Sequence, residues 1–173
     1  MAKTDDVLLA LSRTLPEFIR SVGFFQYEGK TYRLVDNFAS VQRMKCSVCG
    51  NCPIFDVSVI RSENGDRLNV CNNCIDRITY QNVSIWFKSY RKKRENIIEN
   101  RKYIDELLSI LTAYERDELS FRISSEEVEK LQKTFVQMCN GLNLRTEQKQ
   151  LAEYYIRYRA ELLVTAKRIE ERH

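Results

Sequence analysis

Four cysteines in two pairs constrain this chain more than any other feature. Cys46 and Cys49 form one Cys-x-x-Cys pair, and Cys71 and Cys74 form a second pair after 21 intervening residues. A two-residue spacer lets both thiolates of a pair point toward one ion, so two such pairs can complete a tetrahedron. The spacing therefore predicts one structural Zn²⁺ ion held by Cys46, Cys49, Cys71 and Cys74.

The residues between the two pairs have the pattern of a β-hairpin. Residues 54–61 alternate apolar and polar side chains, residues 63–66 have turn chemistry, and residues 67–70 predict a second short strand. Gly50 directly after the second cysteine suits a tight turn, and a helix is expected at 75–79. In this order, the segment resembles a treble-clef or zinc-ribbon-like four-cysteine finger, a structural class that serves many functions.

Other uses of the cysteines stay open. Cys46, Cys49 and Cys52 followed by Pro53 share the beginning of a ferredoxin-type run, although that run has three residues before its last cysteine. An iron–sulfur cluster on these cysteines and one of the second pair is the weaker alternative to zinc, with Cys52 otherwise a spare thiol or a substitute for Cys49. Coincidental spacing of buried or disulfide-bonded cysteines is disfavoured, because no secretory signal is recognised. Cys139 lies in a helical pattern and is expected to be a small buried side chain.

The ligand set argues against catalysis. Four thiolates leave no coordination position for water, so the expected zinc is structural. The single histidine is His173, which disfavours histidine-dependent zinc hydrolases and nucleases as well as Ser-His and Cys-His nucleophile pairs. Six cysteines and one histidine also fall short of the eight ligands of a two-zinc RING module. We therefore expect no enzymatic activity and no small-molecule substrate.

The net charge of +4 is unevenly distributed. Residues 84–102 hold seven Lys and Arg against two Glu, whereas residues 103–144 hold four basic and eight acidic residues. A basic segment beside a metal module favours a polyanionic partner, with a solvated helix face as the plainer interpretation. Trp86 and Tyr90 add stacking surfaces. The residues expected to contact DNA or RNA phosphates are Arg77, Lys88, Arg91, Lys92, Lys93 and Arg94.

The N-terminal segment predicts one helix and one hairpin. Residues 5–22 have apolar side chains at helical intervals, with Pro16 as a point where the helix can divide. Residues 24–35 predict two strands, and residues 36–41 predict a short helix capped by Asp36. Four hairpin aromatics are favoured as core residues, with base stacking as the alternative: Phe24, Phe25, Tyr27 and Tyr32.

The C-terminal half predicts three helices. One runs from Ser84 to about Leu119, a second starts at a capping box of Ser124 and Glu127, and a third starts at Thr146. Short loops between amphipathic helices favour an antiparallel hairpin or bundle. The third helix has heptad-like positions that leave room for a coiled-coil partner or homodimer: Leu151, Tyr155, Tyr158, Leu162, Thr165 and Ile169.

The chain is therefore expected to be an α+β protein in three parts. These are an N-terminal helix and β-hairpin (1–43), a four-cysteine treble-clef-like zinc module (44–83), and a helical bundle or stalk (84–173). No apolar run approaches the ~20 residues that span a bilayer, so an intracellular location is expected. The favoured function is nucleic-acid binding, as a transcription or replication accessory factor. The alternative is a protein-interaction adapter with a zinc-stapled head and a helical stalk.

Overall fold

The computed structural model describes residues 3–119 and 121–170, with side chains up to residue 160. The chain divides into two compact units, each described by itself below. Residues 11–91 form the sheet unit, and residues 1–10 with 92–173 form the helical unit. Both predicted hairpins belong to one sheet in the sheet unit. The division into three domains stays a prediction. No helix in the described part of the chain is long and apolar enough to cross a membrane.

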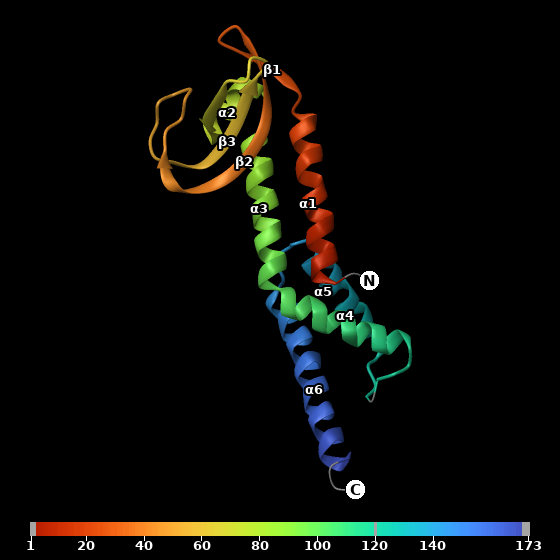
Figure 1. The fold of residues 1–173 in the computed structure, drawn as a ribbon. Helices are drawn as coiled ribbons and strands as arrows, with labels where there is room; N and C mark the ends of the chain where they lie inside the picture. The colour runs from red at the N-terminus through yellow and green to blue at the C-terminus, as the bar shows by residue number, and fades with distance from the viewer. Residues whose placement is uncertain (1–2, 120, 171–173) are drawn as a thin grey trace. The chain divides into compact units, whose positions relative to one another are not determined.

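The sheet is antiparallel with the strand order β1-β2-β3-β4 (Figure 1). It follows helix α1, and the predicted α+β class is confirmed. Pro16 lies inside α1 without ending it. The turn between β1 and β2 contains Gly29 at a φ of +73°, a conformation that glycine adopts without steric cost. The elements up to the second cysteine pair are α1 (Thr4–Ser21), β1 (Phe24–Tyr27), β2 (Lys30–Met44), β3 (Ile54–Ser62) and β4 (Arg67–Cys71).

The predicted helix at 36–41 is wrong, because β2 continues through it to Met44. Strand β3 is largely buried and pairs with this segment, with Asn37 opposite Ser58 and Phe38 opposite Val57. This pairing overrides the local helix signal of Asp36, whose carboxylate accepts from the amide of the next residue, Asn37. Register shifts between Leu34 and Asp36 and again after Ala39 mark irregularities that bend the strand.

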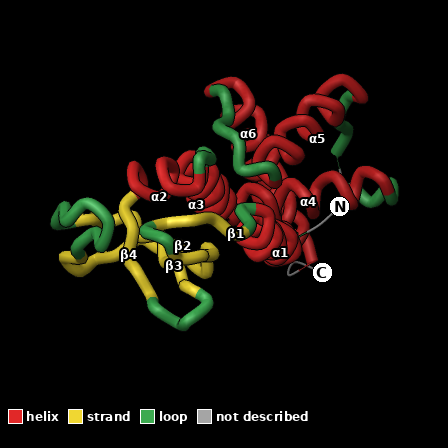
Figure 2. The backbone as a smooth tube through the Cα atoms, turned by 90° about the horizontal axis from the view of Figure 1, so that it is seen from above, coloured by secondary structure: helices red, strands yellow, loops and turns green. Residues whose placement is uncertain are grey.

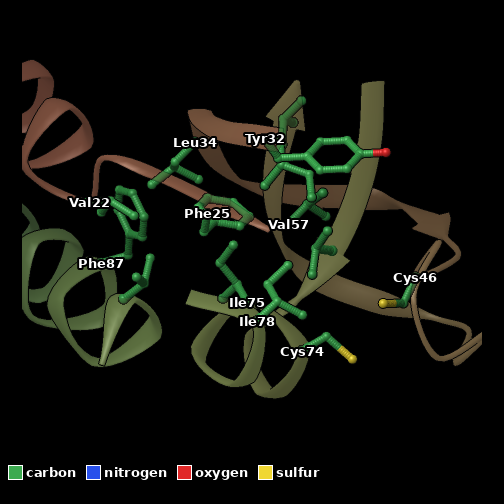
Figure 3. Close-up of a cluster of buried hydrophobic side chains, with 14 of the residues drawn as sticks. Val22, Phe25, Tyr32, Leu34, Cys46, Val57, Cys74, Ile75, Ile78 and Phe87 are labelled. Atoms are coloured by element: carbon green, nitrogen blue, oxygen red, sulfur yellow. The ribbon is translucent and has the colours of Figure 1, made fainter. Parts of the chain in front are cut away.

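Helix α2 (Asn72–Thr79) lies along one face of the sheet (Figure 2). Figure 3 shows the core between them, where Phe25 and Leu34 from the sheet meet Ile75 and Ile78 from α2. Phe87, near the start of α3 (Val83–Glu99), belongs to the same core. Tyr32 is buried with this group, while Phe24 is 69% exposed. The first hairpin therefore has its aromatic residues on both faces.

The helical unit is built on α4 (Arg101–Glu115), α5 (Ser125–Cys139) and α6 (Thr146–Glu170), which pack against one another. The predicted capping box is confirmed, since the Ser124 hydroxyl accepts from the Glu127 amide and the Glu127 carboxylate accepts from the Ser124 amide. Leu162, Thr165 and Ile169 of the predicted heptad pattern lie outside the residues whose side chains the structure describes. The core of the unit includes Ile97, Ile104, Leu107, Ile110, Leu111, Val128, Leu131, Phe135, Met138, Ala152 and Tyr155.

The predicted single helix from Ser84 to Leu119 is wrong, because the chain breaks at Asn100 between α3 and α4. The Asn100 side chain donates to the Asn96 carbonyl (2.7 Å), and the Asn96 side chain donates to the Gly141 carbonyl (2.8 Å). The Asn100 amide still donates to the Asn96 carbonyl (3.1 Å), so this carbonyl accepts from both the backbone and the side chain of Asn100. The apolar periodicity of the sequence does not predict these bonds. Helix α3 starts at Val83, one residue before the predicted cap, and both the amide and the hydroxyl of Ser84 donate to the Asp76 carboxylate.

Candidate metal centre and basic residues

The first cysteine pair lies in a tight turn that follows β2. The Cys46 amide donates to the Asn51 carbonyl, and the Gly50 amide donates to the Cys46 carbonyl, both at 2.9 Å. Gly50 has a φ of +76°, which glycine adopts at little cost. This turn brings Cys49 back beside Cys46, so the two sulfur atoms lie within 4.8 Å of each other.

The second pair lies where β4 meets α2. Cys71 is the last residue of the strand and Cys74 lies in the first turn of the helix. The backbone at Cys71 is extended, at a φ of −73° and a ψ of 164°, and it turns there into α2. The junction of β4 and α2 therefore presents two thiols toward the turn that holds Cys46 and Cys49.

The four sulfur atoms lie within 4.8 Å of one another. The Cys49 and Cys71 sulfurs are 3.8 Å apart, and Figure 3 shows the Cys46 and Cys74 sulfurs turned toward each other. A tetrahedron with Zn–S bonds of about 2.3 Å has sulfur–sulfur edges of about 3.8 Å. The donor set thus fits a single tetrahedral ion, as the spacing of the pairs predicted.

The surroundings of the thiols differ. Burial raises the pKa of the Cys46 thiol, but the backbone amides of Cys71, Cys49 and Val48 outweigh it and lower this pKa to about 6. The Cys71 amide donates to the Cys46 sulfur at 3.3 Å. Burial together with the Cys46 sulfur raises the pKa of Cys71. Burial together with the sulfurs of Cys71 and Cys49 raises the pKa of Cys74 more strongly. A bound cation would favour the thiolate form of all four.

The other cysteines lie apart from this cluster. Cys52 is exposed and does not join the four sulfurs, and Cys139 is half-buried in the helical unit. Burial raises the pKa of the Cys139 thiol. The proposed use of Cys52 in an iron–sulfur cluster therefore finds no geometric support in this arrangement.

A polar network lies next to the second cysteine pair. The Asn72 side chain donates to one oxygen of Asp56 (3.0 Å), and the Arg91 guanidinium donates to the other (2.8 Å). Arg91 also donates to the Asn37 side chain, which in turn donates to Ser58 (2.9 Å). The network joins β2, β3, α2 and α3. The sequence does not reveal this network, because its hydrogen-bonded residues lie 16 to 54 positions apart in the chain.

The predicted phosphate-binding residues have different surroundings. The Arg91 side chain is 24% exposed and engaged in the network, and the Arg77 guanidinium lies 4.0 Å from the Cys74 sulfur. Of the aromatic residues considered for base stacking, the two on α3 are packed within the chain, since Trp86 stacks on Phe18 and on Tyr90, with ring centroids 3.9 and 5.3 Å apart. Like Arg77, the remaining members are exposed and make no ion pair with any described residue: Lys88, Lys92, Lys93 and Arg94.

No protein-family model, curated protein or solved structure matches this chain. Its function is therefore inferred from its own residues and geometry.

Proposed function

We propose that the chain is a non-enzymatic zinc-finger protein that binds nucleic acid. One structural Zn²⁺ ion would be held by the four clustered cysteines, and exposed basic side chains on α3 would contact phosphates. The convergence of four sulfur donors within 4.8 Å carries the proposal. Thiolate donors in a tetrahedral set suit zinc or iron, and four sulfurs within 4.8 Å of one another favour one ion at their centre over a cluster of several iron atoms.

The ion would act by joining elements that are distant in sequence. It would tie the turn after β2 to the junction of β4 and α2, in the manner of a treble-clef finger with its knuckle, hairpin and helix. Since the unfolded chain lacks a preformed site, binding energy at such a centre contributes to folding. With every coordination position taken by sulfur, the ion would have no place for a reacting water.

The metal is tested by native mass spectrometry and elemental analysis of the purified protein. One zinc per chain is expected. Stoichiometric iron with visible absorbance, or no metal bound by a folded protein, would overturn this part of the proposal.

Nucleic-acid contact is supported by the basic residues on α3 that form no ion pair with a described residue. Lys88 and Lys92 are one helical turn apart, and Lys92, Lys93 and Arg94 follow in sequence. Helix residues with free ammonium and guanidinium groups can replace the counterions of a phosphate backbone. Binding of this kind would weaken as salt rises and would depend little on base sequence.

The test is a salt titration of binding to random oligonucleotides. The combined variant Lys88→Gln, Lys92→Gln, Lys93→Gln and Arg94→Gln should lower the slope of log affinity against log salt. A matched control on α5 is Lys130→Gln with Lys133→Gln, because these lysines are ion-paired with Glu126 and Glu129. A folded α3 variant with an unchanged slope would remove α3 from the binding surface.

A protein-binding role is the second candidate, favoured by one observation on α6. Tyr154 is 58% exposed and stacks on Tyr158 with parallel rings and centroids 6.0 Å apart. Large exposed aromatic side chains are common at protein interfaces. Light scattering tests self-association: a dimer that Tyr154→Ser dissociates would support an adapter, and a monomer at high concentration would count against a homodimer.

A further inference from the structure

Three arginines lie directly opposite one another across the sheet. Arg33 on β2 pairs with Arg61 on β3, and Arg61 pairs with Arg67 on β4. At the other end of this row, Phe24 on β1 pairs with Arg33. All four side chains are exposed. We call the three arginines the arginine row.

The arginine row places like charges where a sheet ordinarily avoids them. Directly opposed residues have Cβ atoms about 4.5–5.5 Å apart, and like charges at that distance destabilise the pairing. None of the three guanidinium groups has an ion-pair partner among the described residues. A carboxylate on the neighbouring turn, Asp66, pairs with Lys30 instead (2.9 Å). The row therefore carries positive charge that no described residue compensates by an ion pair.

The arginine row borders two shallow hollows that share Phe24. One, of about 390 Å³, is lined by Phe24, Thr31, Arg33, Arg61, Ser62 and Glu63. The second is lined by the same phenylalanine and Arg33, together with Arg20 from the last turn of α1. Phe24, which is 69% exposed, thus lines both hollows together with arginine side chains.

The overall charge of the sheet unit agrees with an anionic partner. Residues 11–91 contain eleven Lys and Arg against seven Asp and Glu, whereas the residues of the helical unit contain seventeen of each. A zinc ion with four thiolates would add a charge of −2, which leaves the sheet unit positive. The excess positive charge of the chain therefore belongs to the unit that carries the arginine row.

We propose that the arginine row and Phe24 bind single-stranded nucleic acid, an inference that rests on the proposed nucleic-acid function. The guanidinium groups would contact successive phosphates, and Phe24 would stack on a base. Guanidinium groups suit phosphate because they offer a fork of N–H donors. An exposed ring beside a basic track is the arrangement that single-strand binders use, and stacking on it requires a base that is free of a duplex.

The experiment measures binding of the full-length protein to a mixed-sequence single-stranded oligonucleotide over a range of salt. The variant Arg33→Gln, Arg61→Gln and Arg67→Gln should reduce the slope of log affinity against log salt by about 2, since each phosphate contact on a single strand contributes about 0.7. Phe24→Ala should weaken binding about tenfold or more with little change in slope. Glu63→Gln, which removes the one carboxylate lining the hollow, should strengthen binding.

A matched control keeps the charge and changes only the head group. Arg33→Lys, Arg61→Lys and Arg67→Lys should retain the salt slope of the unchanged protein. Circular dichroism should show the Gln variant folded, with a thermal midpoint equal to or above that of the unchanged protein, because the opposed charges are gone.

The outcomes separate this inference from the proposed function. If no oligonucleotide binds, both fail. If the α3 variant loses binding while the folded Gln variant of the arginine row binds with an unchanged slope, this inference fails and nucleic-acid binding stands. Equal affinity for duplex and single strand, or no effect of Phe24→Ala, would overturn the single-strand assignment.

Discussion

Gly141 lies directly against the backbone of Lys93, because a Cβ atom at Gly141 would stand 2.5 Å from the Lys93 carbonyl oxygen and 2.7 Å from its Cα. The Gly141 backbone has a φ of +64°, and its carbonyl accepts from the Asn96 side chain (2.8 Å). The end of α5 is therefore seated on α3 by a contact that only glycine allows. Within the helical unit, this contact positions the C-terminal half of α3 against α5.

Gly141→Ala should destabilise the helical unit by about 3 kcal/mol, from the positive φ and the clash together. Gly23→Ala is the matched control, since Gly23 has a similar φ of +71° but no atom within 4 Å of the added carbon. We expect it to cost only about 1 kcal/mol. Denaturant titration of both variants measures the difference, and equal losses would show that the Lys93 contact is unimportant.

Local features of the fold could be predicted from the sequence because short-range chemistry determines them. The capping box at Ser124 and the hairpin between residues 54 and 71 are encoded within a few neighbouring residues, and both are present. The extension of β2 through residues 36–41 depends on pairing with β3. The break at Asn100 likewise lies beside a long-range contact, in which the Asn96 side chain donates to the Gly141 carbonyl. Such long-range contacts leave no local pattern to read.

The same distinction holds for the candidate sites. The two cysteine pairs were predicted from spacing alone, because four sulfurs at that spacing have few other uses. The arginine row was missed, because Arg33, Arg61 and Arg67 are scattered in the sequence and become neighbours only through the strand register. The sequence also groups Arg91 with free basic residues, because its partners Asp56 and Asn37 lie on strands that are distant in the sequence.

Cys71→Ser should abolish stoichiometric metal binding and unfold the sheet unit. Removing one thiolate from a four-thiolate centre lowers the affinity, and the binding energy of such a centre, about 10 kcal/mol or more, also drives folding. Cys52→Ser is the control, because Cys52 is exposed and outside the cluster. Native mass spectrometry reports the bound metal, and far-ultraviolet circular dichroism reports the fold. Loss of metal from Cys52→Ser to the same extent would contradict the assigned ligand set.

Arg91→Ala should destabilise the sheet unit by about 1–3 kcal/mol, because it leaves the half-buried Asp56 carboxylate without its charged partner. Arg91→Lys should recover only part of this loss, since an ammonium cannot reach both Asp56 and Asn37 as the guanidinium does. Lys88→Ala on the same helix is the control and should leave the stability within about 0.5 kcal/mol, as its side chain is exposed.

A double-mutant cycle separates the Arg91 pair from general effects of truncation. Arg91→Ala and Asp56→Ala together should destabilise less than the sum of the two single changes, by about 1 kcal/mol. Strict additivity in urea titrations would mean that the two groups do not interact in solution.

Tyr155→Phe should make the helical unit more resistant to alkaline unfolding. Tyr155 is 5% exposed, and burial, aided by a hydrogen bond to Glu127, raises its pKa to about 12. In the unfolded chain Tyr155 ionises near pH 10, so the stability that its raised pKa contributes is fully present below pH 10. This contribution, about 2–3 kcal/mol in total, is lost as the pH rises toward 12. The Phe variant should be about 1 kcal/mol less stable at pH 7, where it lacks the hydrogen bond, yet fall less steeply above pH 10. Urea titrations from pH 7 to 11.5 should show the two stability curves converging above pH 10 and then crossing, so that the Phe variant is the more stable at pH 11.5. Exposed Tyr154→Phe is the control. Parallel curves would mean that Tyr155 ionises as readily in the folded chain as in the unfolded one.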